Sequence, residues 1–176
     1  MRKSLFLALA IMMAAPTFAN AEPVFSVGFS PSHGHSALDV VLSAIEGAKD
    51  SVDIAAYSFT SKPIAAALVA AKNRGVAVRI VADPKANAKY TAVTFLANQG
   101  VPVRIDGQYA DGYMHNKFMI VDGDTVQTGS FNYSASAVSR NAENALLVQN
   151  APELAKAYQA EFNRLWNESA VLTNRY

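Results

Sequence analysis

Residues 52–82 read VDIAAYSFTSKPIAAALVAAKNRGVAVRIVA, and this stretch decides the fold. Its first six residues, VDIAAY, form an apolar run of the length expected for a buried strand. A helix should follow, because Ser61 suits its N-cap, Pro63 fits its first turn and Gly75 ends it. The last seven residues, VAVRIVA, then form a second strand. This order of strand, helix and strand indicates a sheet that is at least partly parallel.

The same alternation continues on both sides of this stretch. It predicts an α/β fold with a mixed, largely parallel central sheet and helices on both of its faces. No linker, internal repeat or low-complexity tract interrupts residues 22–176, so we expect a single domain. The expected further strands are 24–29, 101–105, 114–121, a strand from 125 onward and one near 144–148, and the expected further helices are 37–48, 89–98 and 152–166.

The composition is that of an ordinary globular protein. Of the 176 residues, 51% are apolar and 16% are charged, and no Cys occurs. These values exclude collagen-like, disulfide-stabilised and disordered proteins. The formal charge is +1, but it becomes −1 for residues 22–176, which carry 13 Lys and Arg (15 minus 2) against 14 Asp and Glu. Bulk charge therefore gives no indication of a nucleic-acid or anionic-membrane partner.

The first 21 residues have the pattern of a secretory signal peptide. A basic start precedes eleven apolar residues, Leu5 to Ala15, and a small-x-small ending runs from Ala19 to Ala21. As a helix, this apolar run spans about 16 Å, roughly half the apolar core of a bilayer, which argues against a membrane anchor. We expect cleavage after Ala21 and a periplasmic or secreted domain over residues 22–176, without an anchor and without disulfides.

The polar residues that carry chemistry lie in two short motifs, HNKFMIVD at residues 115–122 and GSFN at residues 129–132. Side chains alternate between the two faces of a strand, so His115 and Lys117 point the same way, about 7 Å apart. Asp122 follows His115 by an odd number of residues and lies about 23 Å away along an extended strand. We therefore expect Asp122 to brace the following turn rather than to touch a substrate.

The pairing of the two motifs depends on the loop that joins them. A two-residue loop of Gly and Asp places Lys117 opposite Ser130. It also places His115 opposite Asn132, which gathers four polar side chains on one face. A two-residue loop one position earlier keeps the shared face but sets Ser130 opposite His115. A three-residue loop sends Ser130 and Asn132 to the other face, so a register that pairs His115 with Phe131 contradicts the prediction.

Such a polar face suits a phosphate group. Lys117 supplies positive charge, and Asn132 and Ser130 can donate hydrogen bonds to non-bridging oxygens. His115 can then attack phosphorus, provided that an acceptor holds its other ring nitrogen. Glu143, in the sequence NAEN at the start of the next strand, is our candidate for that acceptor. Taken singly, these residues are more typical of a solvated strand face, an ordinary turn or a surface charge.

The pattern His-x-Lys-x4-Asp, followed after six residues by Gly-Ser-x-Asn, resembles the signature of the phospholipase D superfamily. The stretches AAYSFT at residues 55–60 and RGVAVRI at residues 74–80 are also similar to that family, and the likeness covers about residues 28–166. A short secreted chain with one such motif most resembles the small bacterial endonucleases of the superfamily, typified by an EDTA-resistant periplasmic nuclease.

The resemblance implies a reaction that needs no cofactor. His115 attacks the phosphodiester and forms a phosphohistidine, a second His protonates the leaving alcohol, and water completes the hydrolysis. The family motif also contains Asp122, so a catalytic role for Asp122 stays open beside the expected bracing role. The other implied roles are phosphate binding by Lys117 and Asn132, assistance by Ser130, and orientation of His115 by Glu143.

A single motif leaves such a site without its second histidine. A symmetric homodimer supplies it by bringing two copies of His115 to a shared twofold axis. The alternative is an internal acid, His33 or His35, although neither belongs to a His-x-Lys pair. We expect no metal ion, because this His-Gly-His pair has neither Cys nor a nearby cluster of Asp and Glu to complete a coordination shell.

Three functions of different classes fit these residues. The first is a phosphodiesterase that acts on DNA, with RNA as a further substrate. The second is a phospholipase D-type hydrolase of phospholipid head groups, and the third is a protein that only binds phosphate polymers. The intact polar set disfavours the third, and the small size and the family likeness favour the nuclease. Candidates for further substrate contacts are Tyr109, Tyr113 and Met114 beside the site, and Lys85, Lys89 and Arg104 along a strand-binding groove.

Overall fold

The strand–helix–strand stretch folds as predicted. It forms β2 (Ser51–Ala56), α2 (Lys62–Asn73) and β3 (Ala77–Ala82), and β2 and β3 are parallel neighbours. Ser61 occupies the N-cap position of α2, but its side chain makes no capping hydrogen bond. Gly75 adopts a φ of 97°, a conformation that disfavours other residues and ends the helix at this point.

The computed structural model describes residues 21–32, 34–87 and 91–173. The predicted signal peptide, apart from Ala21, lies outside these residues. In the described part, one eight-stranded sheet has the order β1-β7-β6-β5-β2-β3-β4-β8. Its other strands are β1 (Val24–Ser30), β4 (Val103–Ile105), β5 (Lys117–Val121), β6 (Thr125–Gly129), β7 (Glu143–Gln149) and β8 (Ala170–Val171).

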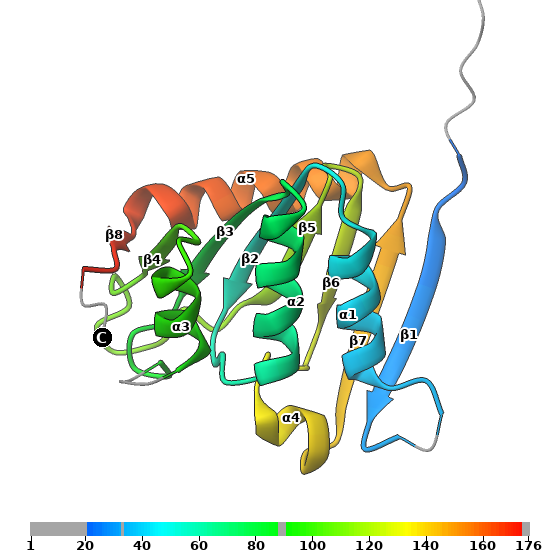
Figure 1. Cartoon of the computed structure of the whole chain (residues 1–176), viewed down its shortest axis with the longest axis horizontal. Helices are drawn as coiled ribbons and strands as arrows, with labels where there is room; N and C mark the ends of the chain where they lie inside the picture. Colours follow the sequence, from blue (N-terminus) through cyan, green and yellow to red (C-terminus); the bar gives the residue numbers. More distant parts are fainter. Residues whose placement is uncertain (1–20, 33, 88–90, 174–176) are drawn as a thin grey trace, which may run out of the picture.

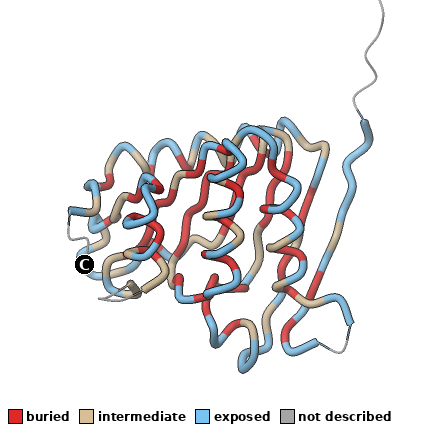
Figure 2. Tube along the Cα trace, in the orientation of Figure 1, coloured by how far each residue is buried: buried red, intermediate tan, exposed pale blue. Residues whose placement is uncertain are grey.

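Helices cover both faces of this mixed sheet, so the predicted α/β class is confirmed. On one face lie α1 (Ala37–Gly47), α2 and α3 (Ala92–Asn98), and on the other lies α5 (Pro152–Glu168) (Figure 1). Buried positions follow the strands and the inner sides of the helices (Figure 2). The short α4 (Ala135–Ser139) and β8 were not expected, and the first residues of the helix predicted from residue 89 lie outside the described part.

The expectation of a largely parallel sheet is wrong. In the described residues, five of the seven neighbouring strand pairs are antiparallel, and only β2–β3 and β3–β4 are parallel. The reason is the connection after β4, which contains no helix in residues 106–116. Parallel neighbours need a long crossover, whereas this chain stays at the end of the sheet where β4 finished and returns as the antiparallel β5.

This topology gathers several strand ends at one edge, which we call the site edge. Strands β1, β2 and β6 end there, and β5 and β7 begin there. Ala56, the last residue of β2, pairs with Lys117, the first residue of β5. Ser30, the last residue of β1, pairs with Glu143, the first residue of β7. The polar residues of both sequence motifs therefore meet at a single edge of the sheet.

A partly buried ion pair holds α5 on the other face of the sheet. Asp53 of β2 is buried and accepts two hydrogen bonds from Arg79 of β3, at 2.8 and 2.6 Å. Gln159 of α5 donates a third, at 2.8 Å. The Arg79 guanidinium also lies over the rings of Phe162 and Trp166 on α5, at 5.0 and 5.3 Å from their centroids. These contacts fix the position of the helix that borders the site.

Candidate active site

Three residues, 122–124, join β5 to β6, so the predicted two-residue loop is wrong. Val121 pairs with Thr125, and continuing this register sets His115 opposite Phe131. The first two loop residues have φ values of 52° and 73°, and both therefore adopt the left-handed conformation. In a regular hairpin, this register would send the two motifs to opposite faces of the sheet.

The polar side chains nevertheless share one hollow, because the regular ladder ends before them. Gly129, the last residue of β6, has a φ of 145°, and a Cβ at this position would collide with the main-chain oxygen of Asn144. Only glycine fits at this point, and after it the side chains no longer alternate between the two faces of the sheet. Beyond it, Ser130 and Asn132 both line the hollow, so the predicted grouping holds for a different reason than the predicted register.

This hollow lies at the site edge and has a volume of about 480 Å³. It brings together four of the six residues expected to form the site, and Glu143 stands beside it through its hydrogen bond to Ser130. An imidazole, an ammonium and an amide around one cavity form a set suited to binding and attacking a phosphate group. The residues that line it are His115, Asn116, Lys117, Phe118, Thr128, Gly129, Ser130, Asn132 and Tyr158.

His115 is exposed, and both ring nitrogens lie close to a cation. The Nζ atom of Lys117 lies 3.2 Å from Nδ1 and 3.4 Å from Nε2. Burial of the ring and the charge of Lys117 lower the pKa of His115 below 6.5, while Asp83 opposes the shift. An ammonium can only donate, so this contact favours a neutral imidazole, whose lone pair can attack phosphorus once Lys117 has moved away from the ring.

A neighbouring aromatic ring packs against this pair. The Tyr57 ring centroid lies 4.3 Å from that of His115, and the Lys117 ammonium lies 5.1 Å from the Tyr57 centroid. Burial lowers the pKa of Lys117, against the charge of Glu143, which raises it. Tyr57 was not identified from the sequence as a site residue, although its place one residue after the end of β2 is a signal that could have found it.

Asn132 has an amide group that the protein itself does not satisfy. Its Oδ1 atom is buried and makes no hydrogen bond within the described residues. A buried amide without a partner costs about 1–3 kcal/mol, and such a group is usually satisfied by water or by a ligand. Oδ1 can only accept, so a water or a ligand donor satisfies it, and the Nδ2 group of Asn132, which lines the hollow, is the part that can donate to substrate oxygens.

Ser130 and Glu143 are bound to each other. The hydroxyl of Ser130 donates to Glu143 Oε2 at 2.6 Å and accepts a hydrogen bond from the Asn144 main-chain N–H at 3.1 Å. The other carboxylate oxygen of Glu143 accepts from Asn141 at 3.0 Å. The structure thus places Glu143 at the site but joins it to Ser130, and none of its hydrogen bonds in the described part goes to His115.

Asp122 lies at the far end of β5 and braces the chain there. Its carboxylate accepts hydrogen bonds from the main-chain N–H groups of Lys49, Asp50 and Ser51, at 2.9, 2.8 and 2.8 Å. Lys49 and Asp50 lie in the connection from α1 to β2, and Ser51 is the first residue of β2. Burial alone would raise the pKa of Asp122, but the three N–H donors lower it below 3.8. This arrangement agrees with the expected bracing role.

The loop before His115 is held by two residues that follow β3. Asp83 is buried and accepts from the main-chain N–H of Met114 at 3.0 Å. The ammonium of Lys85 donates to the carbonyl oxygens of Ala110 and Gly112, both at 2.8 Å. Lys85 is thus engaged in fixing this loop rather than lining a groove. Asp83 was missed in the sequence, where its position directly after a buried strand is the available signal.

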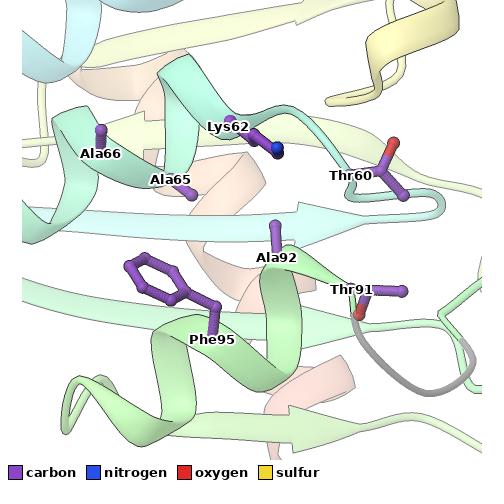
Figure 3. Close-up of a pocket in the computed structure, with 7 residues that line it drawn as sticks. All are labelled: Thr60, Lys62, Ala65, Ala66, Thr91, Ala92 and Phe95. Atoms are coloured by element: carbon purple, nitrogen blue, oxygen red, sulfur yellow. The ribbon is translucent and has the colours of Figure 1, made fainter.

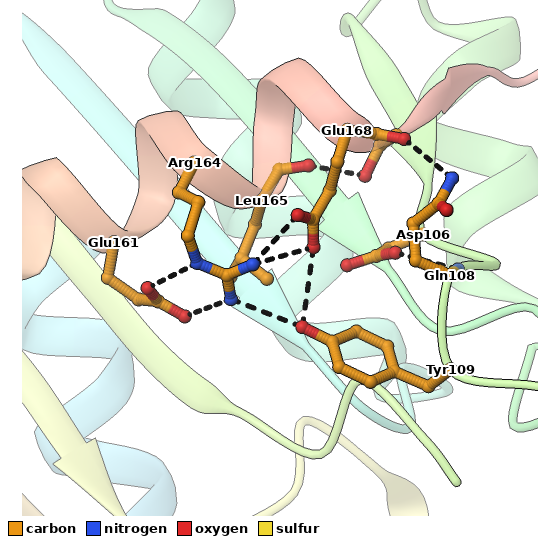
Figure 4. A network of polar contacts seen from close by, with 8 residues as sticks. Asp106, Gln108, Tyr109, Glu161, Arg164, Leu165 and Glu168 are labelled. Carbon is orange, nitrogen blue, oxygen red and sulfur yellow. Dashed lines mark hydrogen bonds and ion pairs between the residues drawn. The ribbon is translucent and has the colours of Figure 1, made fainter. Parts of the chain in front are cut away.

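The other candidates for substrate contacts also have structural roles. The Tyr109 hydroxyl lies 3.1 Å from the Arg164 guanidinium and donates to Glu168 at 3.3 Å, in a network that ties this loop to α5 (Figure 4). Met114 is buried, and Arg104 donates to the main-chain oxygen of Trp166 at 2.7 Å. The remaining candidates are Tyr113, which is 51% exposed and packs edge-on against Tyr57 at 5.4 Å, and Lys89, which lies outside the described residues.

Of the two alternative internal acids, only His35 lies in the described part of the chain, and it does not line this hollow. His33 lies outside that part, and His35 is exposed on the connection between β1 and α1, where its main-chain oxygen accepts from Ser32. No group of three or more metal-ligating side chains occurs in the described part of the chain. The absence of a metal from the reaction stays a prediction.

A second cavity, of about 460 Å³, lies between α2 and α3 (Figure 3). It is lined mainly by apolar groups, including Ala65 of α2 and Phe95 of α3, and Lys62 is the only ionisable residue among the described residues that line it. The described residues that line it include no His, Cys, Asp or Glu, so the polar hollow at the site edge is the better candidate for catalysis.

The chain is similar to known proteins over most of its length. A family model described as cardiolipin synthase, PLD-like domain, matches residues 41–166. Mitochondrial cardiolipin hydrolase of Xenopus laevis is 39% identical over 137 residues, which cover 77% of this chain and 64% of that protein. Phospholipase D of Rickettsia prowazekii is 36% identical over 148 residues, covering 83% of this chain and 70% of that protein. The chain thus spans slightly less than two thirds of the matched cardiolipin hydrolase.

Two solved structures are similar over their whole length. The phospholipase D family member Nuc from Salmonella typhimurium has a TM-score of 0.82 and 42% identity, and the match covers 87% of this chain and 100% of that one. NucT from Helicobacter pylori has a TM-score of 0.76 and 27% identity, with coverages of 86% and 100%.

Proposed function

The chain belongs to the phospholipase D superfamily, and we propose that it is a metal-independent phosphodiesterase. It acts as an endonuclease that hydrolyses DNA, with RNA as a further substrate. The reaction proceeds through a phosphohistidine at a site shared by two copies of the chain. The observation that carries the proposal is the gathering of His115, Lys117 and Asn132 around one hollow. The match to Nuc and NucT over their full lengths supports a nuclease rather than another phosphodiesterase.

The neutral imidazole of His115 is the nucleophile. One ring nitrogen attacks phosphorus and forms a P–N bond, while the P–O bond to the leaving strand breaks. The leaving oxygen takes a proton from His115 of the second copy, which becomes an imidazolium once the bound phosphate has drawn Lys117 away from it and its negative charge favours the protonated ring. That second ring, now neutral, removes a proton from water, and the hydroxide formed displaces His115 from phosphorus. The histidine is thereby regenerated, and a phosphomonoester end is left on one strand.

The neighbouring residues bind the charge that the reaction develops. The ammonium of Lys117 and the amide of Asn132 contact the non-bridging oxygens, and entry of the phosphate moves Lys117 away from the ring nitrogens of His115. Glu143 keeps Ser130 in place and stabilises the charged form of Lys117. The Ser130 hydroxyl donates a hydrogen bond to Glu143, so Ser130 assists by ordering this carboxylate.

A second copy of the chain supplies the second imidazole, because the sequence contains only one His-x-Lys pair. The edge strand β1 supports this assembly. Its side chains Phe25, Val27 and Phe29 are 67%, 49% and 57% exposed, and they share one face of the strand. An exposed apolar edge strand is a common contact surface between protein chains. It ends beside Glu143, so a copy bound there lies next to the site.

A phospholipase D-type hydrolase of phospholipid head groups is the second candidate, since the chemistry is the same. It is favoured by the similarity to proteins named cardiolipin hydrolase and phospholipase D. Purified protein incubated with plasmid DNA and with cardiolipin or phosphatidylcholine vesicles, with and without EDTA, separates the two. We expect DNA cleavage that survives EDTA and little lipid hydrolysis. Activity confined to vesicles, or restored only by a divalent ion after chelation, contradicts the proposal.

We also propose that the chain is exported and acts in the periplasm or outside the cell, because of the signal-peptide pattern in its first 21 residues. Among the described residues, no helix combines the length and the apolar character that crossing a bilayer requires. Cell fractionation, with N-terminal sequencing of the mature protein, tests this location. Recovery in the cytoplasm with residues 1–21 still attached contradicts it.

A further inference from the structure

Tyr158 of α5 lines the same hollow as His115, Lys117 and Asn132. No sequence motif points to it, because it lies 43 residues after His115 in an otherwise ordinary amphipathic helix. Its side chain is half-buried, and it comes from the face of the sheet opposite to α1 and α2 (Figure 1). The hollow therefore has a polar floor at the strand ends and one aromatic wall on α5.

The ring of Tyr158 is held in a fixed orientation. It packs edge-on against the buried ring of Phe118, with centroids 5.0 Å apart and an angle of 71° between the ring planes. The next residue, Gln159, is anchored to the buried carboxylate of Asp53 at 2.8 Å. Because the ring is held before a ligand arrives, contact with a ligand costs little conformational entropy.

The polar end of Tyr158 is unused by the protein. Within the described residues its hydroxyl makes no hydrogen bond, whereas the hydroxyls of Tyr109 and Tyr133 are bound to Glu168 and Gln127. Tyr57 is also occupied, by the ring of His115 and the ammonium of Lys117. Of the two aromatic residues that line the hollow in the described part of the chain, Phe118 is buried, so Tyr158 is the one left for contact with a substrate.

We infer that Tyr158 is a specificity-determining residue that stacks on the nucleobase next to the phosphate being cleaved. This inference rests on the proposed nuclease function and names the part of the substrate that the hollow recognises. Every base offers a flat π-face, so stacking binds single strands with little sequence preference. The glycerol and head group of a phospholipid offer no such face, and Leu would contact their apolar groups equally well.

The test uses short oligonucleotides with one phosphodiester among uncharged methylphosphonate linkages. In one, the two nucleotides beside the phosphodiester carry bases, and in the other both are abasic. We expect Tyr158→Leu to raise KM about 5- to 150-fold for the oligonucleotide with bases, the range measured for loss of one stacking contact. On the abasic substrate the same change should alter KM by less than about twofold, because the contact is already missing. Tyr158→Phe keeps the ring and should behave like the wild type.

Phe95→Leu is the matched control, since it removes an exposed aromatic ring of α3 outside the hollow. Circular dichroism melting shows whether each variant is folded. If Tyr158→Leu does not fold, Tyr158→Trp takes its place, with an expected KM on bases equal to or below the wild-type value and no change on the abasic substrate.

Three results would overturn the inference while leaving the nuclease function intact. They are an unchanged KM for Tyr158→Leu on bases, an equal loss on both substrates, and a loss for Tyr158→Phe as large as that for Tyr158→Leu. The last would assign the contact to the hydroxyl. A wild-type protein that cleaves neither oligonucleotide but hydrolyses cardiolipin vesicles would instead overturn the proposed function and, with it, the stacking role.

Discussion

Lys117 contacts His115 through two groups at once: its Nζ atom lies 2.8 Å from the main-chain oxygen of His115 and 3.2 Å from Nδ1 of the ring. The first contact fixes the ammonium, and the second places it against the nucleophile. A cation in this position destabilises the imidazolium form. The same side chain that binds the phosphate thereby keeps the attacking ring neutral until substrate arrives.

The first prediction concerns the charge state of His115. Burial and the charge of Lys117 lower its pKa below 6.5, so the neutral form prevails at pH 7. Replacing Lys117 with Met removes the charge contribution, and the pKa should move up toward 6.5, with burial still opposing the charged form. NMR titration of the histidine C2 protons measures this shift, and His115→Asn identifies the resonance. A pKa that stays constant or falls in Lys117→Met contradicts the electrostatic role.

The second prediction separates bracing from catalysis at Asp122. Asp122→Asn weakens three hydrogen bonds to a charged acceptor and should reduce the free energy of unfolding by about 1–3 kcal/mol at pH 7. The pKa of Asp122 is lowered on folding, so its contribution is present above about pH 4 and is lost as the pH falls through the folded-state pKa. Urea unfolding at pH 7 and at pH 3 should therefore give a smaller difference at pH 3.

Asp124→Asn is the control for this experiment. Within the described residues, the Asp124 side chain accepts one hydrogen bond, from the neighbouring Thr125, so it does not brace a distant part of the chain. The activity of folded Asp122→Asn should remain within about tenfold of the wild type. An unchanged stability together with a large loss of kcat would assign Asp122 to the chemistry instead.

The third prediction compares two residues of the GSFN motif. Asn132→Ala removes the Nδ2 donor that contacts a non-bridging oxygen, and we expect kcat/KM to fall about 10²- to 10³-fold. Ser130→Ala removes a hydroxyl that is bound to Glu143, and its loss should stay below about tenfold. Steady-state kinetics on plasmid DNA measure both values. A larger loss for Ser130→Ala than for Asn132→Ala reverses the assigned roles.

The fourth prediction tests the contact surface on β1. Placing Asp at both Phe25 and Phe29 puts two charges on the exposed apolar face, so the protein should become monomeric and lose activity at the same time. Phe95→Asp is the control, since Phe95 is 46% exposed on α3. Sedimentation velocity gives the mass of each variant. A dimeric double variant, or a fully active monomer, would rule out this surface or the shared site.

Much of the architecture could be predicted because it is encoded locally. The apolar runs, the capping residues and Gly75 define β2, α2 and β3 with little help from distant contacts. The direction of the later strands could not be predicted in this way. It depends on where the loop of residues 106–116 leads the chain, and that loop is held by Asp83 and Lys85, which are distant in sequence.

The site was predicted as a set of residues but not as a geometry. His115, Lys117, Ser130 and Asn132 do share one hollow. The register that was expected to gather them is wrong, because Asp122 adopts a left-handed conformation and lengthens the loop to three residues. The change of direction at Gly129 compensates for the different register. This change depends on the close approach of Asn144 of β7, and the alternation of side chains along a strand does not reveal that approach.

The central claim is that His115 becomes covalently attached to one strand of the substrate while a second copy of the chain supplies the acid. An oligonucleotide labelled at each end in turn, mixed with the protein and quenched in alkaline SDS, tests this claim most directly. The wild type should carry one labelled end on His115, in a bond that is stable to alkali and cleaved by acid, and the adduct should be absent from His115→Asn. Turnover of the oligonucleotide by His115→Asn at the wild-type rate, with no adduct in either protein, would contradict the account.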